Sequence, residues 1–131
     1  MFTLIGWKSR KQSSIATSTA EAEFAALSEL CSEIIWYKLL IKDVKDEVNQ
    51  AIKVFEDNTT CIHMASMEKM QSRSKHRDIK YHNVREAIKE KLIELQYCET
   101  ERNIADMLTK HLSIQKHKEI TEALGICSAQ T

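Results

Sequence analysis

The 131-residue sequence contains no proline and only two glycines, so few residues mark its turns and loops. It has no apolar run approaching the roughly 18 residues that span a bilayer, and no amino-terminal secretory signal. Its four cysteines are scattered singly, which argues against both a disulfide framework and a zinc knuckle. These absences predict an intracellular protein in a reducing setting, with no membrane segment.

The charges of the sequence cancel, with 19 Lys plus Arg residues and 19 Asp plus Glu residues. Nucleic-acid binding would therefore require a local basic patch. The sequence has no Gly-rich phosphate loop, no nucleotide fingerprint and no G-x-S-x-G turn, and its histidines do not cluster with cysteines at ligand spacing. A nucleotide site, a serine nucleophile and a zinc site are not supported.

The sequence has the composition of a globular protein, with 43% apolar and 29% charged residues, and its length predicts one domain. A β-prone stretch predicts a hairpin over about 2–17. Ser18 and Glu21 have the spacing of a capping box, which predicts that a helix begins there and continues over about 19–42.

Apolar periodicity predicts the remaining elements. These are a strand over about 51–56, a short helix over about 58–67, a helix over about 77–91, a strand over about 92–98, and helices over about 102–111 and 113–124. Strands that alternate with helices indicate an α/β fold, in which helices cover a mixed sheet.

Five strings resemble, in order, the signatures of the ribonuclease H domain of copia-type retrotransposon Pol polyproteins. They are residues 6–12 (GWKSRKQ), 18–27 (STAEAEFAAL), 54–58 (VFEDN), 72–82 (SRSKHRDIKYH) and 104–110 (IADMLTK). The resemblance covers the chain from Leu4 to Ile126, and five ordered strings are more specific than one motif. Arg77 and His111 depart from the family, which usually has an aliphatic residue and a proline there.

The resemblance implies a ribonuclease H-like mixed sheet flanked by helices. It also implies endonucleolytic cleavage of the RNA strand of RNA:DNA hybrids during reverse transcription, with two Mg²⁺ or Mn²⁺ ions held by carboxylates. The implied partners are the hybrid and the reverse transcriptase portion of the parent polyprotein. The implied location is a cytoplasmic particle or the nucleus.

By the same resemblance, the catalytic and metal-binding residues are Glu23, Asp57 and Asp106. Each also has a simpler interpretation. Glu23 suits the start of a helix electrostatically, and Asp57 suits a turn after a strand. Asp106 lies opposite an apolar stripe, as a solvated surface residue does, but a residue that faces a cleft would show the same pattern. For Asp57 the position also favours function, because ligands in α/β sheets gather beyond the carboxyl ends of strands.

Positive charge concentrates in one segment, the basic segment, which consists of Arg73, Lys75, His76, Arg77 and Lys80. Such point charges bind phosphates without reading base sequence, so the basic segment is the predicted hybrid-binding patch. Taken alone, it could equally be the solvated start of a basic helix.

In the family, a first, central strand carries a further aspartate, and no acidic residue precedes Glu21 here. The sequence therefore predicts a partial ribonuclease H-like domain over 1–131 that lacks this strand. We expect weak or no cleavage by this polypeptide alone, and a destabilised sheet unless another chain donates a strand. Two alternatives stay open: a non-enzymatic nucleic-acid-binding remnant and an inert retroelement remnant.

Overall fold

The computed structural model describes residues 4–13, 15–44, 50–67 and 75–126, without the side chains of 75–78. The chain divides into two compact units. The central unit lies within residues 14–99, and the terminal unit combines residues 1–13 with residues 100–131. The interpretation of the whole chain as one domain therefore stays a prediction, and each unit is described by itself.

The central unit begins with a long helix, α1 (Thr19–Val44). Ser18 caps it, because the Ser18 hydroxyl accepts a hydrogen bond from the N–H of Glu21 at 3.1 Å. The Glu21 carboxylate reaches one residue further back than a capping box predicts. It accepts from the N–H of Thr17 at 2.7 Å and from the Thr17 hydroxyl at 2.6 Å. The hydrogen bonds of Ser18 and Glu21 thus fix the start of α1 where the sequence predicts it.

Two strands, β1 (Ile52–Glu56) and β2 (Ile93–Tyr97), pair in parallel, with Ile52 opposite Ile93 and Glu56 opposite Tyr97. Parallel strands need a long crossover. Here it contains α2 (Thr59–Ser66) and α3 (Lys75–Lys89). These elements lie within about two residues of the predicted bounds. The α/β class holds for the described residues, which contain this parallel pair rather than the predicted mixed sheet.

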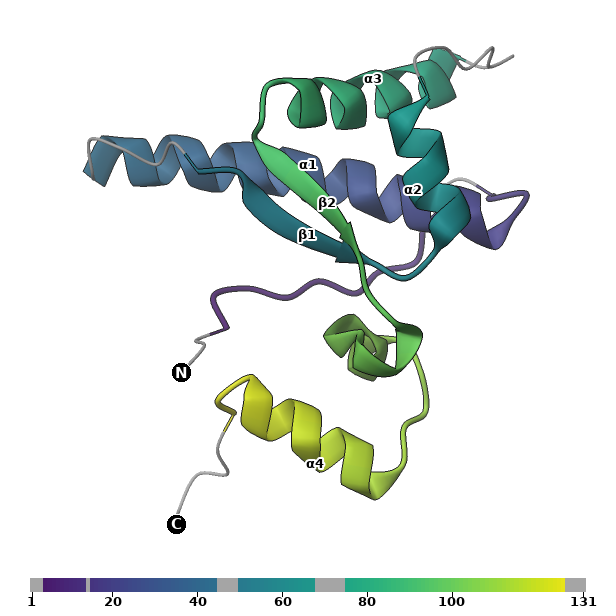
Figure 1. Ribbon diagram of the computed structural model, residues 1–131, viewed down its shortest axis with the longest axis vertical. Coiled ribbons are helices and arrows are strands. Elements are labelled where there is room, and N and C mark those ends of the chain that lie inside the picture. Colours follow the sequence, from purple (N-terminus) through teal and green to yellow (C-terminus); the bar gives the residue numbers. More distant parts are fainter. Residues whose placement is uncertain (1–3, 14, 45–49, 68–74, 127–131) are drawn as a thin grey trace. The chain divides into compact units, whose positions relative to one another are not determined.

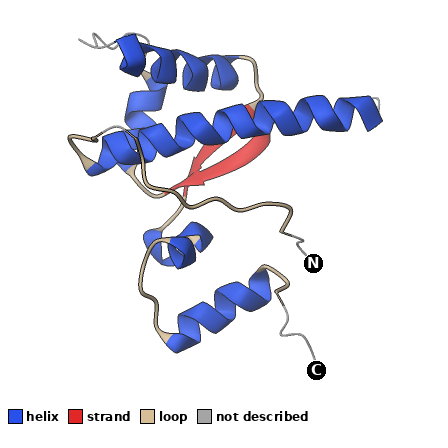
Figure 2. Cartoon of the chain, turned by 180° about the vertical axis from the view of Figure 1, so that it is seen from behind, coloured by secondary structure: helices blue, strands red, loops and turns tan. Residues whose placement is uncertain are grey.

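Figure 1 shows β1 and β2 side by side, with α1 running behind them and α3 alongside α1. Seen from behind, in Figure 2, α1 lies in front of the strands. The burial of β1 agrees with helices on one face of the strands, because Val54 is buried while its neighbours Lys53 and Phe55 are exposed. The buried core draws on all five elements and consists of Phe24, Leu27, Cys31, Ile34, Val54, Cys61, Ala65, Tyr81, Val84, Ala87 and Ile93.

The predicted hairpin over 2–17 is wrong for its described residues, since 4–13 and 15–17 contain no strand. Residues 2, 3 and 14 lie outside the described residues. The terminal unit holds part of this segment through the Ser9 hydroxyl, which donates to the carbonyl of Leu108 at 3.4 Å. The physical reason for the failure is that a two-stranded hairpin is marginal unless a third strand or a helix packs on it.

The helix predicted over 102–111 is replaced by two short 3₁₀ segments, η1 (Thr100–Arg102) and η2 (Ile104–Leu108). Asn103 separates them. Its backbone is extended, and its side chain accepts from the N–H of Ala105 at 3.1 Å. Asparagine often competes with a helix in this way. The last helix, α4 (Ile114–Ala123), is capped by Ser113, whose hydroxyl accepts from the N–H of Lys116 at 3.3 Å.

Among the helices that the structure describes, none has the combination of length and apolar character needed to cross a membrane. Cys31, Cys61 and Cys98 are free thiols. Cys127 lies outside the described residues.

The turn between α3 and β2 places Lys91 in the left-handed region, with φ of 56°. The N–H of Leu92 reaches the carbonyl of Ala87 at 2.9 Å across this turn, the pattern of a Schellman cap, which favours glycine. We therefore expect Lys91→Gly to raise the free energy of unfolding by about 1 kcal/mol. Urea denaturation measures this. The control Glu90→Gly, one residue earlier, should instead be destabilising, and a loss of stability in Lys91→Gly would contradict the prediction.

Candidate functional site

Side-chain hydrogen bonds fix the turn that leads from β1 into α2. Glu56 Oε1 accepts from the N–H of Asn58 at 2.9 Å. Asn58 caps α2, since its Oδ1 accepts from the N–H of Cys61 at 3.0 Å. The Cys61 thiol hydrogen-bonds in turn to the Glu56 carboxyl group. Glu56, Asn58 and Cys61 thus form a closed ring, the strand-end ring, which spans the half-buried Asp57.

Glu56 is buried, with 7% of its surface exposed. Burial raises the pKa of its carboxyl group above the ordinary 4.5; the hydrogen bond from Asn58 opposes this shift, and the charge of Asp57 adds to it. Burial, helped by the charge of Glu56, raises the pKa of the Cys61 thiol to about 12. The thiol therefore stays protonated at neutral pH and acts as a hydrogen-bond donor rather than a nucleophile.

Glu56 should make stability depend on pH. Because its pKa is raised in the folded state, its stabilising contribution is complete below 4.5 and is lost as the pH rises through the raised value. Glutamine cannot ionise. The free energy of unfolding of Glu56→Gln, minus that of the parent chain, should therefore increase from about pH 4 to about pH 8. Urea denaturation of both chains measures this difference, and a flat or falling difference would contradict the assignment.

Glu23 is exposed on α1 near the start of the helix. Its charge contributes to the raised pKa of Cys61, so it lies within electrostatic range of the strand-end ring. Figures 1 and 2 show the start of α1 and the end of β1 at the same end of the central unit. The structure therefore places Glu23 and Asp57, two of the predicted carboxylates, at one end of this unit.

Asp106, the third predicted carboxylate, belongs to the terminal unit and lies in η2. Its side chain is only 13% exposed, and its Oδ1 pairs with Nζ of Lys110 at 2.8 Å. The solvated surface position that periodicity alone suggested is therefore wrong. Its role as a metal ligand stays a prediction.

The donor chemistry of Glu23 and Asp57 suits a hard divalent cation, since proteins often hold Mg²⁺ with one or two carboxylates together with substrate phosphates. Within the described ranges, no group of three or more His, Cys, Asp or Glu side chains is arranged to hold a metal ion. The residue types of Glu23 and Asp57 are thus suited to a divalent cation shared with a phosphate, and metal binding by this chain stays a prediction.

The basic segment lies at the start of α3. This helix begins at Lys75, two residues before its predicted start at about residue 77. Lys75, His76 and Arg77 are in its first turn, and Lys80 follows as a half-buried residue. Arg73 lies outside the described residues. The assignment of this segment to nucleic-acid binding stays a prediction.

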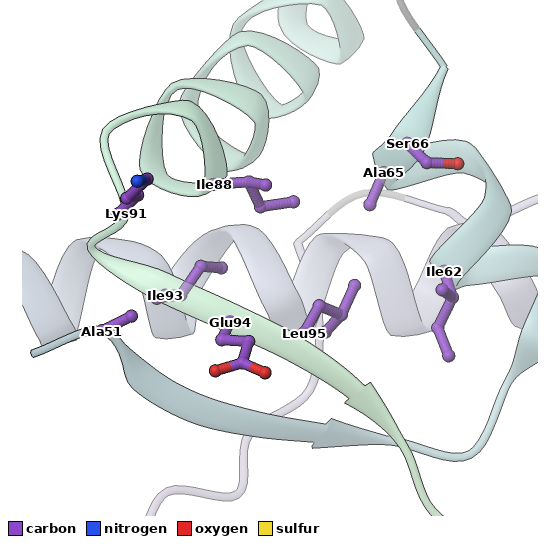
Figure 3. Close-up of a pocket in the computed structure, with 9 residues that line it drawn as sticks. All are labelled: Ala51, Ile62, Ala65, Ser66, Ile88, Lys91, Ile93, Glu94 and Leu95. Atoms are coloured by element: carbon purple, nitrogen blue, oxygen red, sulfur yellow. The ribbon is translucent and has the colours of Figure 1, made fainter.

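A separate pocket of about 470 Å³ opens between α2, α3 and β2. Figure 3 shows its mainly apolar lining, with Ile62 from α2, Ile88 from α3 and Leu95 from β2. Lys91 and Glu94 are the charged residues of the lining. Among the described residues, its lining includes none of the predicted carboxylates and not Lys80 of the basic segment.

Sequence reasoning missed Glu56 and Cys61, which hold the turn that carries Asp57. A signal for Glu56 was available. In a strand that begins with Ile52 and Val54 on one side, position 56 falls on the same inward side. A carboxylate at an inward position needs hydrogen-bond donors. The signal for Cys61 was weaker, because a cysteine in a short helix is usually a small core residue.

The described fold is thus of the α/β class: parallel strands packed with helices, and the carboxylate of Asp57 directly beyond the end of β1. The proteins that this chain matches include Pol and Gag-Pol polyproteins of retrotransposons. It is 32% identical over 124 residues to the retrovirus-related Pol polyprotein from transposon TNT 1-94 of Nicotiana tabacum, an alignment that covers 95% of this chain and 9% of the relative.

Two further relatives come from other hosts. The Pol polyprotein from transposon RE2 of Arabidopsis thaliana is 25% identical over 93% of this chain and 8% of the relative. The transposon Ty1-JR2 Gag-Pol polyprotein of Saccharomyces cerevisiae is 31% identical over 90% of this chain and 7% of the relative. The chain thus spans less than a tenth of each relative. No protein-family model and no solved structure matches it.

Proposed function

We propose that this chain is the ribonuclease H-like segment of a retroelement Pol polyprotein and acts on RNA:DNA hybrids. The observation that carries the proposal is the similarity to Pol polyproteins over 95% of the chain. The five signature strings, in the family's order, support the assignment to the ribonuclease H part of such a polyprotein.

In this proposal Glu23, Asp57 and Asp106 are the carboxylates that hold divalent metal, Mg²⁺ or Mn²⁺, whose chemistry is to activate water and stabilise the leaving oxygen. The location of Glu23 and Asp57 at one end of the central unit supports their part in the site. The basic segment contacts the phosphates of the hybrid. The reverse transcriptase portion of a polyprotein is the proposed partner, and an intracellular particle or the nucleus is the proposed location.

The test compares two polypeptides: the 131-residue chain, and the same chain extended at its amino terminus by a strand that carries an aspartate. Hybrid binding is measured by fluorescence anisotropy at several salt concentrations, and RNA cleavage is measured in Mg²⁺ and in Mn²⁺. We expect salt-dependent hybrid binding by both polypeptides and cleavage mainly by the extended one, because a two-metal site needs several carboxylates. Asp57→Asn should abolish that cleavage.

Each other outcome excludes part of the proposal. Cleavage that survives Asp57→Asn would show that the site is assigned wrongly. Hybrid binding without cleavage by either polypeptide would favour a nucleic-acid-binding remnant without enzymatic activity. The absence of both binding and cleavage would favour an inert remnant.

A further inference from the structure

The backbone around Asp57 is held from both sides by one residue, Glu56. The carbonyl oxygen of Glu56 accepts a hydrogen bond from the N–H of Cys98 at 3.0 Å, which extends the ladder between the strands by one bond. Its carboxyl group accepts from the N–H of Asn58 at 2.9 Å and from the N–H of Asp57 itself. The two peptide groups that flank Asp57 are therefore both tied to Glu56.

The core would accept an apolar residue at position 56 more easily than a carboxylate. Val54, which points the same way, is aliphatic and buried. A buried carboxylate is costly unless donors satisfy it, and here the donors are two backbone amides of the turn and the Cys61 thiol. The Glu56 carboxyl group thus fixes the turn, whereas the carboxylate of Asp57 takes no part in the strand-end ring.

We propose that Glu56 is a positioning residue, which holds the turn so that the Asp57 carboxylate is presented to a divalent cation. This inference rests on the proposed function, since it takes Asp57 to be a metal-binding carboxylate. Glu56 itself touches neither the metal nor the substrate, and it acts only through the backbone of residues 57 and 58.

The experiment uses Mn²⁺ as the probe and the complete 131-residue chain labelled with ¹⁵N. Paramagnetic broadening of the amide signals of Asp57, Asn58 and Cys61 during a titration gives the affinity for Mn²⁺. Glu56→Ala should weaken this affinity about 10- to 100-fold, the usual effect of removing a group that orients a metal ligand. Glu56→Gln keeps the hydrogen-bond acceptor and should keep an affinity close to that of the parent chain.

Two further variants separate the possible outcomes. Val84→Ala creates a cavity at a fully buried core residue of α3, outside the strand-end ring, so it should lower stability and leave the Mn²⁺ affinity unchanged. Asp57→Asn should abolish the specific broadening. If the parent chain shows none, or if Asp57→Asn leaves it unchanged, the proposed site is wrong and the inference fails with it.

If Asp57→Asn abolishes the broadening, the proposed site stands and the inference about Glu56 is judged separately. It is overturned if Glu56→Ala binds Mn²⁺ as the parent does. It is also overturned if Glu56→Gln is as weak as Glu56→Ala, because charge rather than the hydrogen-bond acceptor would then account for the effect. A loss in Val84→Ala equal to that in Glu56→Ala would show a general effect of destabilisation and would overturn it too.

Discussion

Replacing Phe24 by alanine is expected to lower the free energy of unfolding of the central unit by about 3–5 kcal/mol, the usual cost of truncating a buried phenylalanine. Phe24 is 2% exposed, and its ring packs against that of Tyr81 with 4.3 Å between centroids. Truncation removes this contact and leaves a cavity where α1 meets α3. Because small domains are stable by only about 5–15 kcal/mol, this loss should be a large fraction of the stability.

Urea denaturation followed by circular dichroism measures this effect, with Phe55→Ala as the matched control. Phe55 is the same residue type in the same unit, but 59% of its surface is exposed. Its truncation should cost less than about 1 kcal/mol. Similar losses in the two variants would show that α1 and α3 do not pack as described. The result also bears on the site, since Phe24 packs the helix that carries Glu23 against α3.

Neutralising the basic segment is expected to weaken hybrid binding on the order of 100-fold in Lys75→Ala/Arg77→Ala/Lys80→Ala at about 0.1 M salt. Each phosphate contact contributes roughly 0.9 to the slope of the logarithm of affinity against the logarithm of salt. The loss of three contacts should therefore lower the affinity by nearly three decades at most. The slope of the logarithm of affinity against the logarithm of salt should become shallower by about three. Fluorescence anisotropy with a labelled hybrid measures both quantities.

The matched control for this variant is Lys42→Ala/Lys89→Ala/Lys118→Ala. It removes the same number of positive charges from exposed positions on three different helices. If net charge alone attracted the hybrid, the two triple variants would lose affinity equally. We expect the control to keep most of its affinity and its salt slope. Equal losses would remove the basic segment from the proposed interface. The circular dichroism of both variants should match that of the parent chain.

Most elements of the central unit could be predicted from the sequence because their signals are local. Helical spacing in α1, alternation in β1 and the Ser18 cap involve residues a few positions apart. The hairpin was predicted wrongly because strands depend on partners that propensity does not supply. Over residues 102–111 Asn103 interrupts the predicted helix by capping a new turn, and Ile104 and Leu108 of the predicted apolar stripe are exposed.

The candidate site could be predicted only in part. The signature strings pointed to Glu23, Asp57 and Asp106, and the structure places the first two at one end of the central unit. The pairing of Asp106 with Lys110 joins residues four positions apart, and it was within reach of sequence reasoning. The hydrogen-bond partners of Glu56 were not, because alternation places position 56 on the inward side of the strand but does not identify the donors that satisfy its carboxyl group.

The sequence by itself determined the α/β class, the start of α1, the two strands and the similarity to retrotransposon Pol polyproteins. Turn, cap and periodicity signals involve residues a few positions apart, so they can be interpreted without knowledge of the fold. Only the tertiary structure decided which donors satisfy the Glu56 carboxyl group, that Cys61 completes the strand-end ring, and that Glu23 lies within its electrostatic range. Burial and long-range electrostatics depend on residues that folding brings together, so no local pattern encodes them.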